Sequence, residues 1–301
     1  MFLYIRWRIM EFQHLRQFKV IAELEHMTRA SEKLHVAQPA LSKIIRILED
    51  ELKVKLFDRV GKNIKLNQNG HILLKYTNEI MCALDDVKKE MSDVNEQQDN
   101  RVVILMYAAS KLLPKILLDI KKQYPEYKFI IKQHETEKEI NADLFIYSTK
   151  EKVHESNVVT LLEEEILLAV PNDHAFASKQ NIRLEEAASE SFISLQTGKD
   201  LRDITTSYCR MAGFEPEIIL ESDDPATVRG FIGVGLGIAF LPAITWGGGV
   251  DNSIKLLSIA NIPCNRYINL SFKKGRYQSR ATKVVCQHIV EFFKSLQKDD
   301  V

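Results

Sequence analysis

The sequence predicts an α+β chain of two parts, an all-helical N-terminal part and a larger α/β part. Through most of residues 11–94, apolar residues recur every three or four positions, which is the spacing of helices with one buried face. From residue 101 the pattern changes to short apolar runs separated by helical patterns, which is typical of an α/β domain. A length of 301 residues suits about two domains. The polar stretch 95–100, NEQQDN, marks the expected boundary.

Three helices are expected before residue 53. Residues 11–25 predict the first, and a short second helix follows for which Thr28 is a suitable cap. The third starts near Pro39, because proline is tolerated in the first turn, where its missing N–H has no partner. The apolar stripe of this third helix consists of Leu41, Ile45, Leu48 and Leu52.

The opposite side of the third helix is polar. Its side chains are Gln38, Ser42, Lys43 and Arg46. A short helix, a tight turn and a longer helix with a polar leading end form the helix-turn-helix pattern, in which the second helix enters the DNA major groove. An ordinary helical hairpin with a solvated face has the same pattern, and this stretch alone leaves both interpretations open.

A basic hairpin is expected directly after the third helix. Arg59 and Lys62 flank a turn at Gly61, and Ile64 and Leu66 alternate with a lysine. Such a wing suits phosphate contacts, which set register and salt-dependent affinity, whereas a plain solvated turn is the alternative. The formal net charge is zero, so DNA binding has to rest on local charge. Residues 10–70 contain eleven Lys and Arg against eight Asp and Glu, which is a mild excess.

A long helix is expected over residues 70–94, capped by Asn67 or Asn69. Its apolar positions at Ile80, Leu84, Val87, Met91 and Val94 are spaced four, three, four and three apart. This is a heptad seam, which favours pairing with a second copy of the helix. Packing on its own domain is the alternative.

The α/β part contains nine short apolar runs between residues 102 and 272, with helices expected at 112–124, 199–212, 224–234 and 279–298. Strands alternating with helices predict largely parallel sheets, in two small lobes. Two helix starts, at Ser110 and after Thr197, Gly198 and Lys199, combine free N–H groups with a hydroxyl or an ammonium, which suits an anion. Simple helix caps are the alternative.

Several classes of protein are disfavoured. The cysteines at 82, 209, 264 and 286 form no C-x-x-C pair and no cluster with histidine, so no metal site is predicted and a reducing cytosol is expected. The opening MFLYIRWRI is too short for a membrane span, and is interpreted as an extension before Met10. Glycines between 230 and 237 follow a helix and precede a strand, the reverse of a dinucleotide-binding loop.

The motifs of both parts occur in a fixed order. Residues 30–45 contain A-S-x-x-L-x-V-A-Q-P-A-L-S-x-x-I, LEDEL ends this helix, and KLFDR follows. The second part contains LLPKILLDIKKQYPEY, EEEILLAVPNDHAFA and VGLGIAFLP in that order. In this arrangement the chain resembles the LysR-type transcriptional regulators, over about residues 10–298.

The resemblance implies a winged helix-turn-helix, a dimerising linker helix, and an effector domain similar to periplasmic binding proteins with a ligand cleft between its lobes. The implied bounds are 10–69, 70–95 and 96–301, with lobes 101–160 plus 266–301, and 161–265. The implied partners are double-stranded DNA with an interrupted palindromic operator, further copies of the chain in a homodimer or homotetramer, and RNA polymerase for an activator. No cofactor is expected besides a small-molecule effector, and no enzyme activity or membrane association. A solute-binding protein without a transport role would lack the first 70 residues.

The resemblance also assigns site residues. DNA contacts fall at Thr28, Gln38, Pro39, Ser42, Lys43, Arg46, Arg59 and Lys62, with bases contacted by Gln38, Ser42 and Lys43. Glutamine can bond adenine bidentately and lysine can reach guanine, so the chemistry agrees. Effector contacts fall at Ser110, Thr136, Thr197, Gly198 and Lys199. The sequence departs from the family in a shortened 134–142 segment and in Glu135, which stands where a glycine is common and disfavours an anion nearby.

Overall fold

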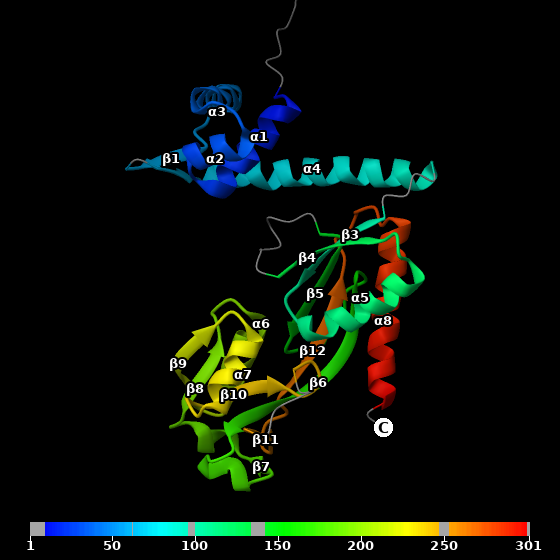
Figure 1. Cartoon of the computed structure of the whole chain (residues 1–301). Helices are drawn as coiled ribbons and strands as arrows, with labels where there is room; N and C mark the ends of the chain where they lie inside the picture. The colour runs from blue at the N-terminus through cyan, green and yellow to red at the C-terminus, as the bar shows by residue number, and fades with distance from the viewer. Residues whose placement is uncertain (1–9, 62, 96–99, 134–141, 247–252, 300–301) are drawn as a thin grey trace, which may run out of the picture. The chain divides into compact units, whose positions relative to one another are not determined.

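The computed structural model of the chain describes residues 10–61, 63–95, 100–133, 142–246 and 253–299 (Figure 1). The chain separates into two compact units between residues 98 and 99. Each unit has a hydrophobic core of its own. Among the described residues, no helix is both long and apolar enough to cross a membrane.

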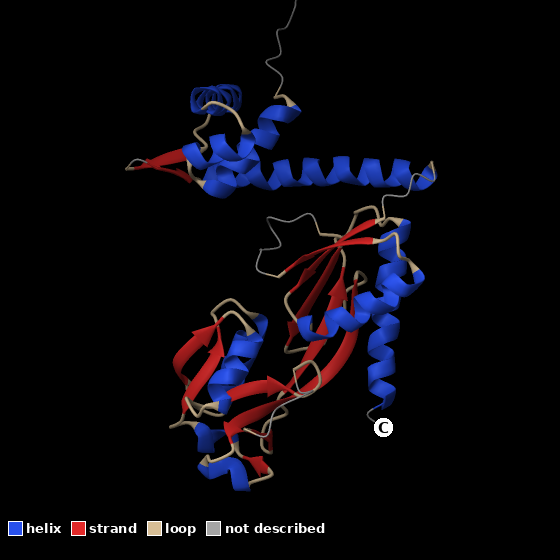
Figure 2. Cartoon of the chain, in the orientation of Figure 1, coloured by secondary structure: helices blue, strands red, loops and turns tan. Residues whose placement is uncertain are grey.

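The first unit contains the three helices, the hairpin and the long helix that the sequence predicts (Figure 2). Its elements are α1 (Phe12–Leu24), α2 (Met27–Leu34), α3 (Gln38–Leu52), β1 (Phe57–Val60), β2 (Asn63–Leu66) and α4 (Gln68–Val94). Phe18 and Leu48 are fully buried between α1 and α3, and the Phe18 ring meets Phe57 of the wing edge-on at 5.8 Å. Leu52 was expected in the buried stripe but is 37% exposed, because it is the last residue of α3 and extends past the core.

Side chains fasten the wing to the helical core. The Glu25 carboxylate, at the end of α1, accepts a hydrogen bond from the backbone N–H of Leu66 at 2.7 Å. Glu49 of α3 likewise accepts one from the N–H of Leu56 at 3.0 Å. Both acceptors are carboxylate oxygens, and each bond joins the helical core to the wing or to the residue that precedes it. The wing is therefore held in a defined position relative to α3.

The side-chain caps predicted for the second helix and for the long helix of the first unit had different outcomes. Of the two caps predicted for the long helix, Asn67 or Asn69, the structure has Asn67, whose Oδ1 accepts a hydrogen bond from the N–H of Gly70 at 3.0 Å. Thr28 does not cap α2: the helix begins one residue earlier, and His26 is the cap, its Nδ1 accepting from the N–H of Arg29 at 3.4 Å. Thr28 therefore lies inside the first turn, with its side chain exposed.

The second unit alternates strands and helices. Its longer elements are β3 (Arg101–Met106), α5 (Leu113–Gln123), β4 (Lys128–Lys132), β5 (Leu144–Thr149), β6 (Val158–Pro171), β8 (Ser191–Leu195), α6 (Asp200–Met211), β9 (Glu217–Ser222), α7 (Pro225–Gly233), β10 (Ala239–Pro242), β11 (Ile254–Ile259), β12 (Asn265–Ser271) and α8 (Arg280–Asp299). A two-residue strand, β7 (Asn181–Ile182), and three short 3-10 turns complete the described part. The 3-10 turn Ser110–Leu112 leads directly into α5.

Two hydrophobic cores divide the second unit into two lobes. The core of lobe 1 lies between β3, β5, α5 and α8, with Ile104, Ile116 and Phe293 at its centre. The core of lobe 2 lies around β8, β10, α6 and α7, with Phe192 and Leu241 at its centre. The long strand β6 contributes residues to both cores, so it crosses from one lobe to the other, and β12 returns beside it.

The sheets are mixed, so the expectation of largely parallel sheets was wrong. Along the main sheet the described strands run β4-β3-β5-β12-β6-β11-β7, with β10 also paired to β6, while β8 and β9 form a separate pair. Parallel pairing of the described strands is confined to β3 with β4 and β5, β7 with β11, and β8 with β9. The crossing strand β6 pairs antiparallel with β10, β11 and β12, because the chain passes along β6 into lobe 2 and returns beside it.

Candidate functional sites

The polar side of α3 is a surface of exposed side chains. Leu41 and Leu48 are fully buried on one side of the helix. The predicted contact residues Gln38, Pro39, Ser42, Lys43 and Arg46 are all exposed. The start of α3 has no side-chain cap and no acidic residue in its first turn. Its N–H groups and the positive end of its dipole are therefore available to a phosphate.

Other predicted DNA contacts lie on neighbouring elements of the first unit. Thr28 is exposed on α2 and Arg59 is exposed on β1 of the wing. Lys62 lies outside the described residues. Two exposed basic residues, Arg29 of α2 and Lys65 of β2, were not among the predicted contacts. Their basic character and their position beside Thr28 and Arg59 make them further candidates for phosphate contacts.

An apolar stripe follows one side of α4. Ile80, Leu84, Val87, Met91 and Val94 are 42%, 39%, 48%, 62% and 76% exposed. By contrast, the apolar residues Val285, Ile289 and Phe293 of α8 are buried in lobe 1. An exposed apolar stripe at heptad spacing is typical of a helix that pairs with another helix.

A cavity of about 340 Å³ opens between the lobes of the second unit. This volume lies within the range of small-molecule sites. Lobe 1 contributes Met106–Ser110 and Gln133, lobe 2 contributes Leu195, Lys199–Leu201 and Asp223–Pro225, and Trp246 and Arg266 complete the lining. Below, we call this cavity the cleft.

The effector contacts expected from sequence are distributed unevenly around the cleft. Ser110 and Lys199 line it. Thr197 and Gly198 are exposed and are not among the lining residues. Thr136 lies outside the described residues, as do Glu135 and most of the shortened 134–142 segment.

Sequence reasoning missed the carboxylates of the cleft. Asp200, Asp223 and Asp224 all line it, and all come from helix starts of lobe 2. Asp224 caps α7 by accepting hydrogen bonds from the N–H groups of Ala226 and Thr227, and these bonds hold the pKa of its carboxyl below the usual value even though burial opposes them. The sequence placed Asp223 and Asp224 at a helix start, but it carried no sign that this start and α6 border one cavity.

Asp200 joins the two lobes. Its Oδ2 accepts hydrogen bonds from the backbone N–H and the hydroxyl of Ser148, at 2.8 and 3.4 Å. Ser148 belongs to β5 of lobe 1, whereas Asp200 is the first residue of α6 in lobe 2. Burial raises the pKa of Asp200, although the Ser148 hydrogen bonds and the Arg266 guanidinium oppose that shift.

A buried ion pair lies where β6 and β12 cross between the lobes. Arg266 of β12 is 2% exposed, and its Nε donates to Oε1 of Glu164 on β6 at 2.9 Å. Its Nη2 donates to the Thr245 hydroxyl at 2.6 Å. Glu164 also accepts hydrogen bonds from the N–H groups of Ile244 and Thr245. Burial lowers the pKa of Arg266, and the Glu164 carboxylate counteracts that shift.

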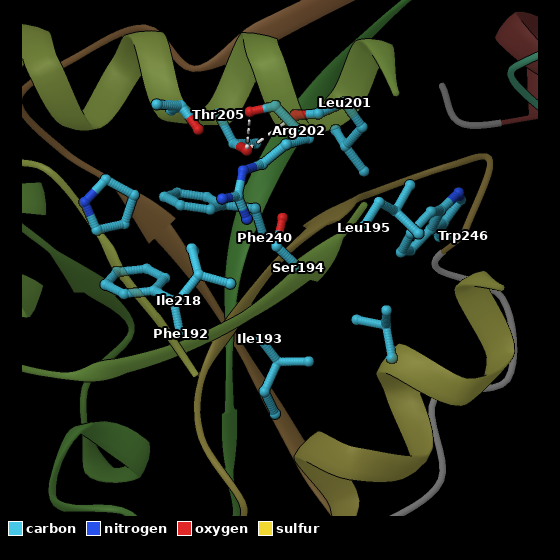
Figure 3. A pocket seen from close by; sticks show the side chains of 13 residues that line it. Phe192, Ile193, Ser194, Leu195, Leu201, Arg202, Thr205, Ile218, Phe240 and Trp246 are labelled. Carbon is cyan, nitrogen blue, oxygen red and sulfur yellow. Dashed lines mark hydrogen bonds between the residues drawn. The ribbon is translucent and has the colours of Figure 1, made fainter. Parts of the chain in front are cut away.

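A second pocket lies inside lobe 2 and is much smaller. Figure 3 shows its lining side chains, with Arg202 of α6 directed toward the aromatic group around Phe240. Its volume is about 10 Å³, which is room for about one water molecule. Arg202 pairs through Nη2 with Glu221 at 3.3 Å, while its Nη1 is buried without a hydrogen-bond partner among the described residues. This pocket can hydrate Arg202 but is too small for a metabolite.

The cysteines of lobe 2 are held as neutral thiols. Burial raises the pKa of both Cys209 and Cys264 to about 12. No group of His, Cys, Asp and Glu within the described ranges is arranged to hold a metal ion. Since the thiolate is the reactive form of cysteine, neither residue is suited to nucleophilic or redox chemistry in the folded chain.

We expect Cys209 and Cys264 to resist alkylation in the native chain. A rise in pKa from 9.0 to about 12 lowers the thiolate fraction at pH 8 by roughly 1,000-fold. The native chain and the chain unfolded in urea are treated with iodoacetamide at pH 8 and analysed by peptide mass spectrometry. At the time when both residues are alkylated in the unfolded chain, both should still be unmodified in the native chain. Labelling of native Cys209 at the rate of the unfolded chain would contradict its burial.

Comparisons with known proteins agree with both units. Residues 12–71 match the bacterial regulatory helix-turn-helix protein family of lysR type, and residues 96–294 match the LysR substrate binding domain. The uncharacterized HTH-type transcriptional regulator YybE of Bacillus subtilis (strain 168) is 33% identical over 294 residues, covering 94% of this chain and 99% of the relative. The transcriptional dual regulator GltC of the same organism is 28% identical, with coverages of 96% and 99%.

Solved structures show the same fold. A full-length OxyR variant from Pseudomonas aeruginosa superimposes with a TM-score of 0.65 at 23% identity, covering 93% of this chain and 94% of that one. The LysR family transcriptional regulator CbnR has a TM-score of 0.65 at 17% identity, with coverages of 93% and 98%. The chain therefore belongs to the LysR family of DNA-binding transcriptional regulators, as its sequence motifs predicted. It is a regulator and not an enzyme.

Proposed function

We propose that this regulator binds an interrupted palindromic operator as a homodimer or homotetramer and is controlled by a small molecule bound in the cleft. In this proposal residues 10–69 bind DNA, 70–95 form the dimerisation helix, and 96–301 bind the effector, in lobes 101–160 plus 266–301, and 161–265. A cytoplasmic location follows from this role. The observation that carries the proposal is the exposed polar side of α3 on a helical core whose wing is fastened by Glu25 and Glu49.

The DNA contacts follow from the position of each side chain. Gln38, Ser42 and Lys43, in the first half of α3, contact bases in the major groove, because recognition helices present their N-terminal residues there. Pro39 aims the helix start at the backbone. Thr28, Arg46, Arg59 and Lys62 contact phosphates, which position the protein without selecting sequence. The uncapped start of α3 supports a phosphate contact as well.

The apolar stripe of α4 supports the oligomer. A second copy of α4 that packs on Leu84, Val87 and Met91 removes their apolar surface from water, and this favours association. Two copies then present two α3 helices to two half-sites, so the operator has the two-fold symmetry of the dimer. The complex of full-length CbnR with its target DNA has the same fold, with a TM-score of 0.62, 18% identity and coverages of 95% and 99%.

The cleft supports control by a ligand. It is bordered by both lobes and by the crossing strands, so its occupant contacts parts of the chain that can change their relative position. A ligand with different affinity for two arrangements shifts their populations and can alter the spacing of the DNA-binding domains. Among the effector contacts predicted from sequence, Ser110, Thr136, Thr197, Gly198 and Lys199, the two that line the cleft are the first choice for substitution.

Gel-shift titration with DNA from the gene's own upstream region tests the DNA-binding assignment. Gln38→Ala should weaken operator binding by about 1–3 kcal/mol and relax selection at one base pair, because one bidentate base contact is lost. Arg59→Ala should weaken binding to operator DNA and to random DNA equally. It should also reduce the slope of the logarithm of the binding constant against the logarithm of the salt concentration by about one. Gln13→Ala, the same substitution at an exposed residue of α1, is the matched control. Equal losses on operator and random DNA in Gln38→Ala would refute its base contact.

A further inference from the structure

Two charged side chains of the cleft, those of Arg266 and Asp200, each use only part of their hydrogen-bonding capacity on the described residues. Arg266 lines the cleft, and its guanidinium uses Nε on Glu164 and Nη2 on Thr245. Its Nη1 donates to none of the residues that the structure describes. Asp200 also lines the cleft and uses only Oδ2, which binds Ser148. Its Oδ1 accepts no hydrogen bond from the described part of the chain.

These two groups are of opposite charge and line the same cavity. The positive charge of Arg266 opposes the rise in the pKa of Asp200, and the negative charge of Asp200 opposes the fall in the pKa of Arg266. Asp200 and Arg266 do not form a hydrogen bond with each other, because the carboxylate binds Ser148 and the guanidinium binds Glu164. Nη1 of Arg266 and Oδ1 of Asp200 are therefore available to a bound molecule that offers an acceptor to the first and a donor to the second.

The balance of charge around the cleft excludes a simple anion as the best ligand. Arg266 is already compensated by the buried Glu164, which leaves Lys199 as the other basic residue of the described lining. Against it stand the carboxylates of Asp200, Asp223 and Asp224. The first turn of α6 contains its own acids, so the positive end of that helix is already partly neutralised. This revises the expectation of an anion site that the helix start suggested.

A simple cation is not the best fit either. It would leave Nη1 of Arg266 unpaired and would approach a guanidinium that is almost completely desolvated. One molecule with a positive and a negative group a short distance apart suits both protein groups. The remaining lining includes Leu195, Trp246 and Gln133, which can accommodate a side chain of mixed character.

We propose that the ligand of the cleft is a small zwitterion of the α-amino acid class, with its ammonium group on Asp200 and its carboxylate on Arg266. This inference rests on the proposed function, since it names the class of molecule that the effector site takes. In this proposal Asp200 has two roles. It determines ligand specificity, and it links lobe 2 to lobe 1, because the same carboxylate accepts a hydrogen bond from Ser148 of lobe 1. An ammonium group on Oδ1 then strengthens the attachment between α6 and β5.

The first test compares amino acids with their two fragments. The full-length chain is titrated by calorimetry with each of the twenty standard L-amino acids. Every binder is then compared with the primary amine that lacks the carboxylate and the carboxylic acid that lacks the amine. We expect at least one amino acid to bind, and both of its fragments to bind at least about tenfold more weakly, since each loses one charged hydrogen bond. The proposal is overturned if no amino acid binds, or if an acid binds as tightly as its amino acid.

The second test uses a matched pair of variants on one helix. Asp200→Asn keeps an oxygen that can accept the Ser148 hydrogen bonds and removes the negative charge. It should lower the affinity for the amino acid by about tenfold or more. Asp203→Asn makes the same change at an exposed residue of α6 outside the cleft lining and should bind as the unaltered chain does. Undiminished affinity in Asp200→Asn would overturn the proposal. DNA binding of the same preparations is measured without ligand: a chain that binds operator DNA but no amino acid refutes the zwitterion alone, whereas a chain that binds no DNA refutes the proposed function.

Discussion

Glu164→Ala is expected to lower the free energy of unfolding of the second unit by about 3–5 kcal/mol. The carboxylate is fully buried against Arg266, and its removal leaves a guanidinium desolvated and without its counter-ion. It also leaves the N–H groups of Ile244 and Thr245 without an acceptor. An effect of this size is a large fraction of the stability of a typical domain.

Urea unfolding followed by tryptophan fluorescence measures this effect. The chain has two tryptophans, so a Trp7→Phe background leaves Trp246 alone, next to Thr245 and buried in the second unit. Glu165→Ala provides the control, because Glu165 is the adjacent residue of β6 but is exposed. If both variants unfold at the same urea concentration, the Glu164–Arg266 ion pair does not contribute the predicted stability to the second unit.

Leu84→Glu combined with Val87→Glu is expected to convert the oligomer to a monomer, with self-association weakened by about 100-fold or more. Both residues are partly exposed at the centre of the α4 stripe, and a paired helix would bury two carboxylates there without partners. Glutamate is a good helix former, so α4 itself should persist. Loss of the dimer should also reduce operator binding, because each monomer can occupy only one half-site.

Sedimentation velocity over a range of concentrations measures the association directly. Ile72→Glu is the matched control, since Ile72 is 52% exposed on the same helix but lies outside the heptad seam. Circular dichroism of each variant shows whether the helix content is retained. A double variant that remains fully dimeric would show that the copies pair through another surface.

Local patterns of residues were sufficient for the first unit. Hydrophobic spacing identifies α3, and the exposed polar residues follow from the same periodicity, because a helix that buries Leu41 and Leu48 must turn its polar residues outward. The cap at Asn67 was also predictable, since capping depends on residues within one turn. Thr28 was misjudged because His26, earlier in the same turn, also offers an acceptor, and helix ends shift easily by one or two positions.

The sequence by itself therefore determined the helix-turn-helix, the heptad stripe of α4 and the family. These depend on contacts between residues that are neighbours along a helix or a hairpin. Only the tertiary structure decided the character of the cleft. Asp200 and Arg266 are 66 residues apart, and β6 and β12 bring them together with Glu164 and Ser148 by antiparallel crossing between the lobes. Their presence in one cavity depends on long-range strand order, which no local periodicity encodes, and so the ligand class that we propose changed from an anion to a zwitterion.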